Sequence, residues 1–252
     1  MERWKDKVAV VTGASSGIGE AICKQLVAHG LKVVGLARRK HLIERNAEKL
    51  QGERGKLYAL RADLCKEEDI LHAFDWIAEN LGSIAILVNS AGIVHANSLL
   101  DGETKAWKET FDTNVLGPCI ATREAVKLMR RNNIDGHIVH INSLSGHRVY
   151  NFPNMNVYQA TKHAITALTE TLRQELVSQG SKIRVSSISP GSVRTDFMKQ
   201  SSVPFPEEIF EMLKQAPTLD PKDIADAVCY VLSAPPHVQI HELIIKPTGE
   251  ML

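Results

Sequence analysis

The sequence has few cysteines, and they are widely separated. The four cysteines in 252 residues form no Cys-x2-Cys pair; they are Cys23, Cys65, Cys119 and Cys229. Disulfide frameworks of small secreted domains and zinc modules both depend on closely spaced cysteines. We therefore expect neither a disulfide framework nor a metal site, and we expect a reducing compartment.

An excess of one charge and a long hydrophobic run are also lacking. The 30 basic residues balance the 29 acidic ones, which argues against a nucleic acid partner or an anionic membrane surface. No apolar run reaches the roughly 20 residues of a transmembrane helix. The first apolar run begins at Val8, which is too early for a signal peptide. These absences predict a cytoplasmic protein without a transmembrane segment.

Short apolar runs alternate with segments of helical periodicity along nearly the whole chain. Strands are expected at Val8–Val11, Leu31–Ala37, Leu57–Ala62, Ile84–Val88, Gly136–Ile141, Ile183–Ile188 and near 240–245. Helical patterns follow at about 18–30, 42–50, 70–77, 103–113, 115–132, 156–179 and 220–233. This alternation predicts the α/β class: a doubly wound parallel sheet of about seven strands, with helices on both faces, in a single domain over 1–252.

One long stretch, about 192–218, has no clear periodicity. It contains Pro204, Pro206 and Pro217, and we expect it to be irregular. Long loops within compact domains are usually functional, and many of them are lids. We therefore predict a substrate lid at about 192–218.

The first expected strand leads directly into a glycine-rich turn. Its spacing is Gly-x3-Gly-x-Gly, which differs from the Gly-x-Gly-x2-Gly dinucleotide fingerprint. Glycines allow a tight turn and a close approach of the backbone to a pyrophosphate, and the N–H groups of the following helix then face the phosphates. The position between strand and helix predicts a cofactor site formed by Gly13, Ser15, Ser16, Gly17, Ile18 and Gly19.

The second expected strand ends in Ala37-Arg38-Arg39. An acidic residue at this place would bind the ribose hydroxyls of NAD. Guanidinium groups instead suit a phosphate. The pair Arg38 and Arg39 therefore predicts NADP(H), although two solvated charges at the start of a helix are the alternative.

A tyrosine and a lysine lie four residues apart at Tyr158 and Lys162. On a helix this spacing places both side chains on one face. An ammonium beside a phenol favours the phenolate, so we expect Lys162 to lower the pKa of Tyr158. Tyr158 then exchanges a proton with a carbonyl or alcohol oxygen, which a nearby serine hydroxyl holds. An isolated pair of this kind also arises by chance on solvated helices.

The chain resembles the short-chain dehydrogenases/reductases over essentially its whole length. The resemblance rests on motifs in a fixed order: Thr12-Gly13-x3-Gly17-x-Gly19, Asp63-Leu64, Asn89-Ser90-Ala91-Gly92, Asn114, Ser143, Tyr158-x3-Lys162 and Pro190-Gly191-Ser192-Val193-Arg194-Thr195. It implies a Rossmann sheet and an NADP-dependent oxidoreductase that acts by hydride transfer. Ser90 departs from the family pattern, which usually has asparagine there.

The resemblance also implies a role for individual residues. The catalytic group would be Asn114, Ser143, Tyr158 and Lys162, with Tyr158 and Lys162 also contacting the cofactor. Asn114 would kink its helix and hold a water behind the active-site lysine. The remaining cofactor contacts would be Asp63 and Leu64 at the adenine, Asn89, Ala91 and Gly92 after the fourth strand, Pro190, Gly191, Val193 and Thr195 at the nicotinamide, and Glu44 as a weaker candidate at the adenosine.

Two serines compete for the role of orienting the substrate. Ser143 lies 15 residues before Tyr158, whereas Ser145 lies 13 residues before it, which is the commoner family interval. We prefer Ser143 because Gly146 follows it by three residues, as the family pattern has it. The loop 147–155 is then two residues longer than usual.

The substrate side is less determined. The segments Glu2–Trp4, Val33–Arg38, Ser143–Val149 and His237–Ile240 are similar to an animal subgroup of the family that includes insect farnesol dehydrogenases and vertebrate 17β-hydroxysteroid/carbonyl reductases. The candidate substrate wall is mostly apolar and contains methionine, which predicts a lipophilic alcohol or its aldehyde or ketone, such as an isoprenoid, a steroid or a retinoid. Candidate substrate contacts are Ser143, Ser145, His147, Val149, Tyr150, Met155, Tyr158 and Phe197.

The sequence leaves two other functions open and predicts an oligomer. A non-catalytic NADP-binding protein that senses redox state is the main alternative, and an epimerase or dehydratase is a third, disfavoured because no second acid/base is evident. The helices expected at 115–132 and 156–179 carry apolar residues around much of their circumference, which predicts a homodimer or homotetramer.

Overall fold

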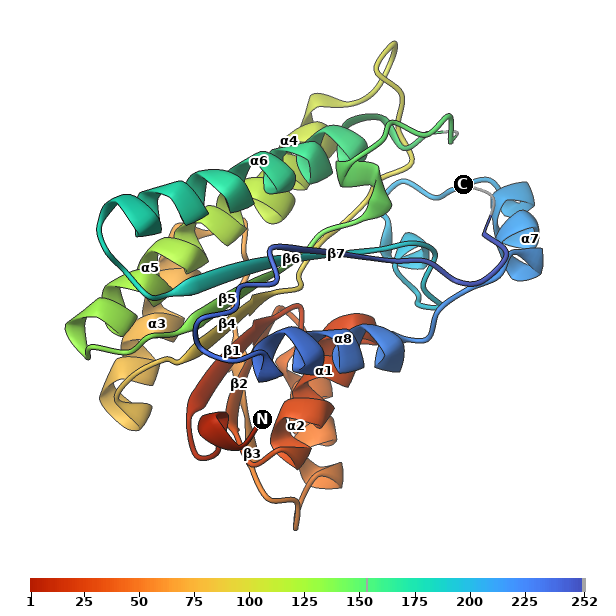
Figure 1. The fold of residues 1–252 in the computed structure, drawn as a ribbon. Coiled ribbons are helices and arrows are strands. Elements are labelled where there is room, and N and C mark those ends of the chain that lie inside the picture. Colours follow the sequence, from red (N-terminus) through yellow and green to blue (C-terminus); the bar gives the residue numbers. More distant parts are fainter. Residues whose placement is uncertain (153, 251–252) are drawn as a thin grey trace.

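A parallel sheet of seven strands forms the centre of the computed structural model, which describes residues 1–152 and 154–250 (Figure 1). The strand order is β3-β2-β1-β4-β5-β6-β7, and every neighbouring pair is parallel. The predicted doubly wound α/β fold is therefore confirmed. The strands are β1 Val8–Thr12, β2 Lys32–Ala37, β3 Lys56–Arg61, β4 Ile86–Asn89, β5 His137–Ile141, β6 Arg184–Pro190 and β7 Glu242–Ile245.

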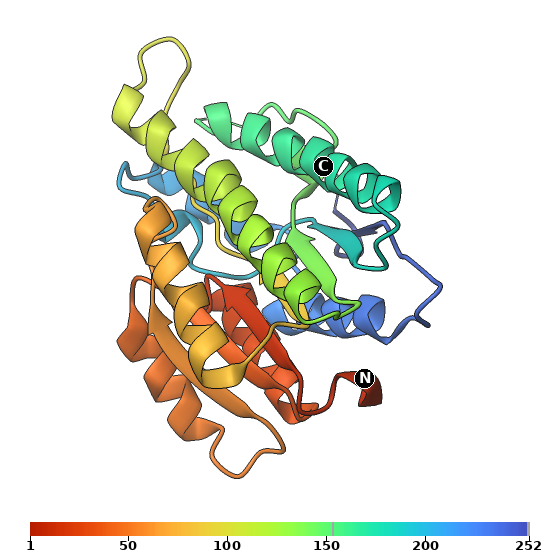
Figure 2. The ribbon, with the colours of Figure 1, turned by 90° about the vertical axis from the view of Figure 1, so that its left-hand side faces the viewer.

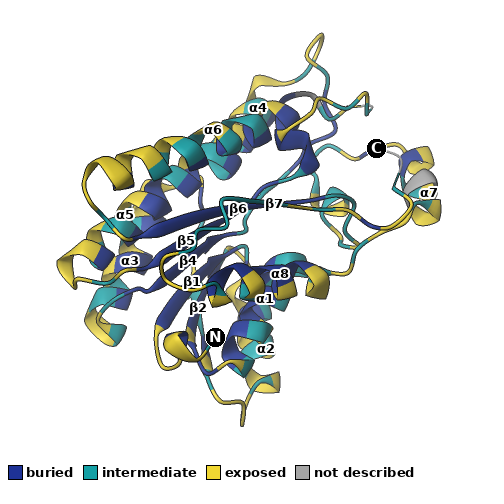
Figure 3. Cartoon of the chain, in the orientation of Figure 1, coloured by how far each residue is buried: buried dark blue, intermediate teal, exposed yellow. Residues whose placement is uncertain are grey.

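Helices cover both faces of this sheet (Figures 1 and 2). One layer contains α1 Gly17–Ala28, α2 Lys40–Lys49 and α8 Pro221–Ser233, and the other contains α3 Glu67–Leu81, α5 Gly117–Arg131 and α6 Asn156–Ser178. The central strands are buried along their length, whereas the outer faces of the helices are exposed (Figure 3). This two-sided burial explains why the strands read as continuous apolar runs.

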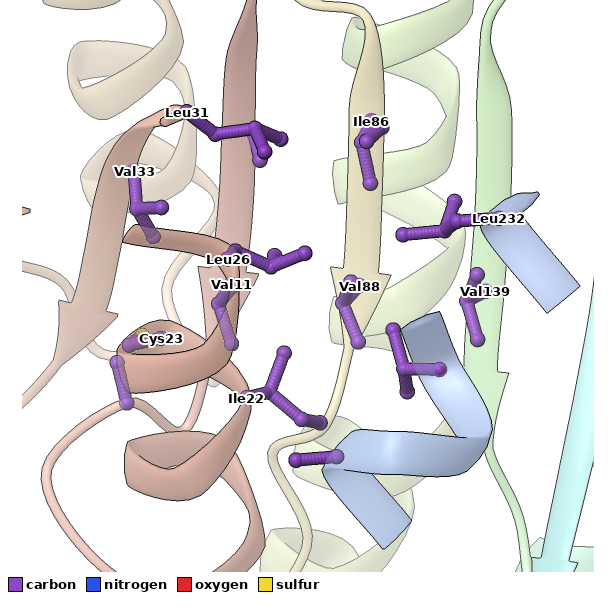
Figure 4. Packing of buried hydrophobic residues seen from close by; sticks show 14 of the residues in the cluster. Val11, Ile22, Cys23, Leu26, Leu31, Val33, Ile86, Val88, Val139 and Leu232 are labelled. Carbon is purple, nitrogen blue, oxygen red and sulfur yellow. The ribbon is translucent and has the colours of Figure 1, made fainter. Parts of the chain in front are cut away.

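The first layer is held by aliphatic packing between α1, α8 and the sheet. Ile22 and Leu26 of α1 are fully buried, and they lie with Val11, Val88 and Leu232 in one apolar cluster (Figure 4). Burying one such side chain stabilises the fold by about 1.5–3 kcal/mol. The layer fixes the start of α1 relative to the ends of β1 and β4.

The carboxyl ends of the strands share one edge of the sheet. Thr12 pairs with Leu36, and Ile141 pairs with Ile188. The strand order reverses between β1 and β4, and in open α/β sheets ligands bind outside the carboxyl ends at such a reversal. The fold thus brings every predicted loop motif to this edge.

A short π-helical turn interrupts the long helix before β5. It spans Asp112–Leu116 between α4 Thr104–Phe111 and α5, and Asn114 is buried within it. The predicted local break at Asn114 is confirmed. Such π turns inside helices are rare and occur frequently at functional sites.

The stretch 192–218 is more ordered than we expected. It contains a 3₁₀ turn at Met198–Gln200 and the nine-residue helix α7 Glu207–Gln215, so the expectation of an irregular stretch is wrong for these two segments and holds for the rest of the stretch. The prolines were misleading because Pro204 and Pro206 precede the helix and Pro217 follows it, where proline is tolerated. The ends of the stretch are joined, since Leu219 N–H donates to the Ser192 carbonyl at 2.8 Å.

No helix of the described residues is both long enough and apolar enough to cross a membrane.

Candidate active site

The glycine-rich turn after β1 is packed tightly against the loop after β4. Gly13 has a φ of +69°, and a Cβ there would lie 2.8 Å from the Ala91 Cα, so only glycine fits. The Thr12 hydroxyl accepts the N–H groups of Ser90 and Ala91, each at 3.1 Å. These contacts hold the backbone of both loops at the amino end of α1, where a phosphate binds well.

Arg39 lies over this turn. Its Nη2 atom is 3.1 Å from the Ser16 Oγ and 3.4 Å from the Ser15 Oγ, and it donates to the Gln200 Oε1 at 2.9 Å. Within residues 1–152 and 154–250, no carboxylate forms an ion pair with Arg38 or Arg39. Two guanidinium groups without a carboxylate partner at the end of β2 suit a phosphate.

The predicted adenosine contacts do not all lie together. Asp63 follows β3 and accepts the Cys65 N–H at 3.2 Å, whereas Leu64 packs in the core beneath α3 and α5. Glu44 forms an exposed ion pair with Lys40 at 3.1 Å and lines a groove between α2 and β3. No described contact links Glu44 to the glycine turn, so its role stays a prediction.

Buried polar atoms at the end of β4 lack partners. Asn89 donates from Nδ2 to the Thr122 hydroxyl at 3.1 Å and contacts His140 Nδ1 at 3.2 Å. The Asn89 Oδ1 and the Ser90 hydroxyl, by contrast, have no hydrogen-bond partner among the described residues. Unpaired buried polar atoms are costly. Their position beside the glycine turn fits a polar ligand.

The loop after β6 meets the glycine turn from the other side. Gly191 N–H donates to the Ile245 carbonyl at 2.7 Å, and Val193 forms a β-bridge with Leu219. A Cβ on Gly17 would lie 3.2 Å from the Thr195 Cγ2. The loop expected to bind the cofactor phosphates and the loop expected to bind the nicotinamide are therefore in contact. One dinucleotide can then lie along both loops. Gly92 is close as well, because a Cβ there would lie 3.6 Å from the Asn114 Oδ1.

Tyr158 and Lys162 lie together on α6, with both side chains buried. Lys162 Nζ donates to the Ile141 carbonyl at 2.9 Å and lies 5.8 Å from the centroid of the Tyr158 ring. Burial raises the pKa of Tyr158 to about 12, although a hydrogen bond with Ser143 acts in the opposite direction and lowers this pKa. Burial lowers the pKa of Lys162 to about 8.

These directions correct one expectation about the tyrosine. We expected Lys162 to lower the pKa of Tyr158, but burial dominates because it disfavours the charged form of both groups. In the free protein, Tyr158 is therefore a neutral phenol at neutral pH. That form is the proton donor.

Of the two candidate serines, Ser143 is the one that acts on Tyr158, because a side-chain hydrogen bond with Ser143 favours a lower pKa of the Tyr158 phenol. Ser145 is buried, and its N–H donates to the Ser143 Oγ at 3.1 Å. The backbone of Ser145 thus orients the Ser143 hydroxyl toward Tyr158.

Asn114 connects the loop after β4 to α6. Its Oδ1 accepts the Ile93 N–H at 2.8 Å, and its Nδ2 donates to the Ile93 carbonyl at 2.9 Å and to the Thr161 hydroxyl at 3.2 Å. The Thr161 hydroxyl donates in turn to the Tyr158 carbonyl at 2.6 Å. The expected water-holding role of Asn114 stays a prediction.

An apolar cluster covers Tyr158. Phe197 lies with its ring centroid 5.7 Å from that of Tyr158, and Met155 belongs to the same cluster. The structure therefore brings these two predicted substrate residues to the tyrosine. Val94 and Ala96 were not predicted from the sequence, because they are ordinary small apolar residues in a loop. The cluster also contains Phe152, Met198, Val203, Phe205, Ile209 and Phe210.

Besides the two serines, three predicted substrate residues lie outside this cluster. His147 Nε2 contacts the Ser189 Oγ at 2.9 Å and the Glu242 Oε1 at 3.4 Å. Tyr150 is held through its backbone by the amide of Gln159, at 2.5 and 2.9 Å. Val149 is 73% exposed. Substrate contact by these residues stays a prediction.

The carboxyl edge of the sheet therefore combines a phosphate-type glycine turn, unpaired buried polar atoms and a buried Ser–Tyr–Lys group. These residues fit a dinucleotide, and a fold and site of this kind define a class of oxidoreductases. The chain belongs to the short-chain dehydrogenase family, whose model matches residues 7–204. Among the described residues, no group of three or more histidine, cysteine, aspartate or glutamate side chains is placed to hold a metal ion.

Named relatives cover nearly the whole chain. A farnesol dehydrogenase of Aedes aegypti is 48% identical over 252 residues, which is 99% of each chain. A human protein named dehydrogenase/reductase SDR family member 11 is 46% identical over 254 residues, covering 100% of this chain and 98% of its own. An alcohol dehydrogenase of Thermococcus sibiricus, solved with 5-hydroxy-NADP, is 28% identical with a TM-score of 0.84, covering 98% and 99% of the two chains.

Proposed function

We propose that this protein is an NADP(H)-dependent oxidoreductase that interconverts a lipophilic alcohol and its aldehyde or ketone. The observation that carries the proposal is the contact between Tyr158 and Ser143 beneath an apolar cluster, at the sheet edge that also carries the glycine turn. The proposal also draws on the names of the relatives, one of which is a farnesol dehydrogenase.

The arginines at the end of β2 support NADP(H) over NAD(H). Arg39 sits beside the Ser15 and Ser16 hydroxyls, and Arg38 is exposed at the same strand end. A 2′-phosphate offers both groups a counter-charge, whereas a ribose hydroxyl would leave two cations unpaired. The archaeal alcohol dehydrogenase, which shares this fold, was likewise solved with an NADP derivative.

The bound cofactor would supply or accept the hydride at the substrate carbon. In the direction of reduction, Tyr158 donates its proton to the carbonyl oxygen. Ser143 donates a hydrogen bond to the same oxygen and stabilises the negative charge that develops there. Lys162 donates to the Ile141 carbonyl. Its positive charge lies near Tyr158, which becomes a phenolate when it gives up its proton. Residues Gly13–Gly19, Arg38, Arg39, Asn89, Ala91, Gly92, Pro190, Gly191, Val193 and Thr195 would hold the cofactor.

The stretch 192–218 serves as the substrate lid in this proposal. Phe205 and Ile209 are buried, and they belong to the cluster that covers Tyr158. Aliphatic, aromatic and methionine side chains bind apolar molecules and adapt to their shape. The substrate is accordingly a lipophilic alcohol or carbonyl compound, such as an isoprenoid, a steroid or a retinoid.

A cofactor and substrate screen tests the proposal. The consumption of NADPH and of NADH is followed by absorbance with a panel of lipophilic aldehydes and ketones. We expect turnover with NADPH and a preference for it over NADH. Tight binding of NADPH without turnover of any carbonyl compound would instead support the redox-sensing alternative.

The cofactor preference has its own test in Arg38→Asp. The added carboxylate repels a 2′-phosphate and can accept hydrogen bonds from a ribose, so the ratio of kcat/KM for NADPH to that for NADH should fall by at least about tenfold. An unchanged ratio would contradict the assignment of Arg38.

A further inference from the structure

A buried carboxylate lies beside the loop after β6, and neither the sequence motifs nor the proposed chemistry uses it. It belongs to Glu250, whose side chain is only 6% exposed. The chain turns back after β7, because the Glu250 N–H donates to the Pro247 carbonyl at 3.1 Å. A Cβ on Gly249 would lie 4.0 Å from the Pro217 Cγ, in the chain that follows α7. The turn brings Glu250 to the base of the lid.

The carboxylate is built into the backbone of that loop. Glu250 Oε1 accepts the Ser192 N–H at 2.8 Å. A Cβ on Gly191 would lie 2.4 Å from the Oε2 and 2.7 Å from the Oε1 of Glu250. Position 191 must therefore lack a side chain for the carboxylate to reach Ser192. Gly191 is therefore required for the contact between Glu250 and Ser192.

The position of Ser192 makes this hydrogen bond important for the site. Ser192 is the first residue of the stretch 192–218, and its carbonyl accepts the Leu219 N–H at 2.8 Å. The chain then continues through Val193 to Thr195, which lies against the glycine turn. Glu250 thus fixes the point at which the nicotinamide loop and both ends of the lid meet.

The charge of Glu250 is only partly compensated. Lys246 Nζ lies 3.8 Å from the Oε2 atom, a distance beyond a hydrogen bond, and no described residue donates a hydrogen bond to Oε2. A buried carboxylate held by one backbone N–H and one distant cation is costly to maintain. Holding a functional loop in place is a physical reason to keep it.

We propose that Glu250 is a positioning residue that holds the loop 190–195 in the geometry required by the nicotinamide half of the cofactor. The inference rests on the proposed function, since it presumes a dinucleotide at this edge. Glu250 acts through Ser192 and touches neither the substrate nor the reacting atoms. It should therefore influence the nicotinamide half and leave the adenosine half unaffected.

Two probes separate the halves: NADPH, and 2′,5′-ADP, which lacks nicotinamide. In Glu250→Ala we expect the Kd for NADPH to rise about tenfold, in line with the loss of a charge-assisted hydrogen bond, while the Kd for 2′,5′-ADP stays within about twofold. Glu250→Gln should recover most of the affinity, because its amide oxygen still accepts the Ser192 N–H. Glu79→Ala, on the exposed face of α3, is the matched control and should change neither Kd.

Equal weakening of both probes, or no change in either, would overturn the inference. If wild-type protein binds neither probe, the proposed function itself fails, which is a separate result. A second measurement covers the case in which Glu250→Ala does not fold. Gly191→Ala should raise the Kd for NADPH by displacing the carboxylate, while the Kd for 2′,5′-ADP stays within about twofold. An equal effect of Gly191→Ala on both probes would also overturn the inference.

Discussion

At the scale of single residues, burial controls the chemistry of this site. Tyr158, Lys162 and His140 are all buried, and in each case burial is the main cause of the pKa shift. Burial disfavours whichever form is charged. The tyrosine is therefore kept as a neutral acid, and the lysine holds its proton less firmly than an exposed lysine.

A titration tests the state of the tyrosine in the free protein. Because the pKa of Tyr158 is raised to about 12, its phenolate should be absent at neutral pH and should form only in strong alkali. The difference in tyrosinate absorbance between the wild type and Tyr158→Phe isolates this residue from the other three tyrosines. A tyrosinate signal already present near neutral pH would mean that Lys162 prevails over burial.

The serine assignment is also tested at single positions. Ser143→Ala removes the hydroxyl that contacts Tyr158, and kcat should fall by about 10²–10³. Ser145→Ala keeps the backbone N–H that binds the Ser143 Oγ, so kcat should change by less than about tenfold. The reverse ranking in steady-state assays would assign the role to Ser145.

The sequence alone predicted the roles of Tyr158 and Lys162 but gave no sign of a role for Glu250. Tyr158 and Lys162 were accessible because a helix converts a spacing of four residues into a shared face. Glu250 was not accessible, since its partner Ser192 is 58 residues away in the chain and only the fold brings them together. The direction of the Tyr158 pKa was wrong for the same reason, because burial depends on the lid and on long-range packing.

At the scale of elements, β5 carries two buried histidines behind the site. Burial, together with the charges of Arg184 and Arg3, lowers the pKa of His137 to about 3. Burial, together with the charge of Lys162, lowers that of His140 to about 4. Since His140 Nδ1 accepts from Asn89, protonation at that atom would break this hydrogen bond.

These histidines predict acid sensitivity of the fold. Their folded pKa values lie below the ordinary 6.5, so their contribution to stability is complete above pH 6.5 and is lost as the pH falls toward 4. The loss is on the order of 3 kcal/mol for each. Urea unfolding at several pH values measures it. His140→Gln, which cannot titrate, should reduce the slope of the unfolding free energy between about pH 5 and 6.5 by nearly one proton, and an unchanged slope would contradict this prediction.

The elements themselves were predicted well where periodicity was strong. All seven strands and the long helices lie close to their expected positions, because apolar runs and 3.6-residue patterns report burial directly. Helix α7 was missed because prolines on both sides masked a short amphipathic segment. Its helical state is supported by burial of Ile209 in the apolar cluster that also contains Tyr158, which is tertiary packing.

At the scale of the whole molecule, exposed apolar side chains support the predicted assembly. Leu116, the last residue of the π turn, is 53% exposed, and Phe111, which directly precedes the turn, is 40% exposed. Contact between copies through this surface would cover them. Light scattering should therefore report a dimer or tetramer, and Leu116→Glu should shift it toward smaller species. A wild-type monomer at micromolar concentration would contradict this proposal.

The whole site depends on one proton donor at the edge of one sheet. Tyr158→Phe removes that proton and keeps the ring that packs against Phe197. The decisive measurement compares NADPH-dependent reduction of a lipophilic carbonyl compound, and the Kd for NADPH, in the wild type and in this variant. We predict a loss of kcat of about 10²–10⁴ with a Kd within about threefold. Near-normal turnover by Tyr158→Phe would contradict the proposed role of the tyrosine.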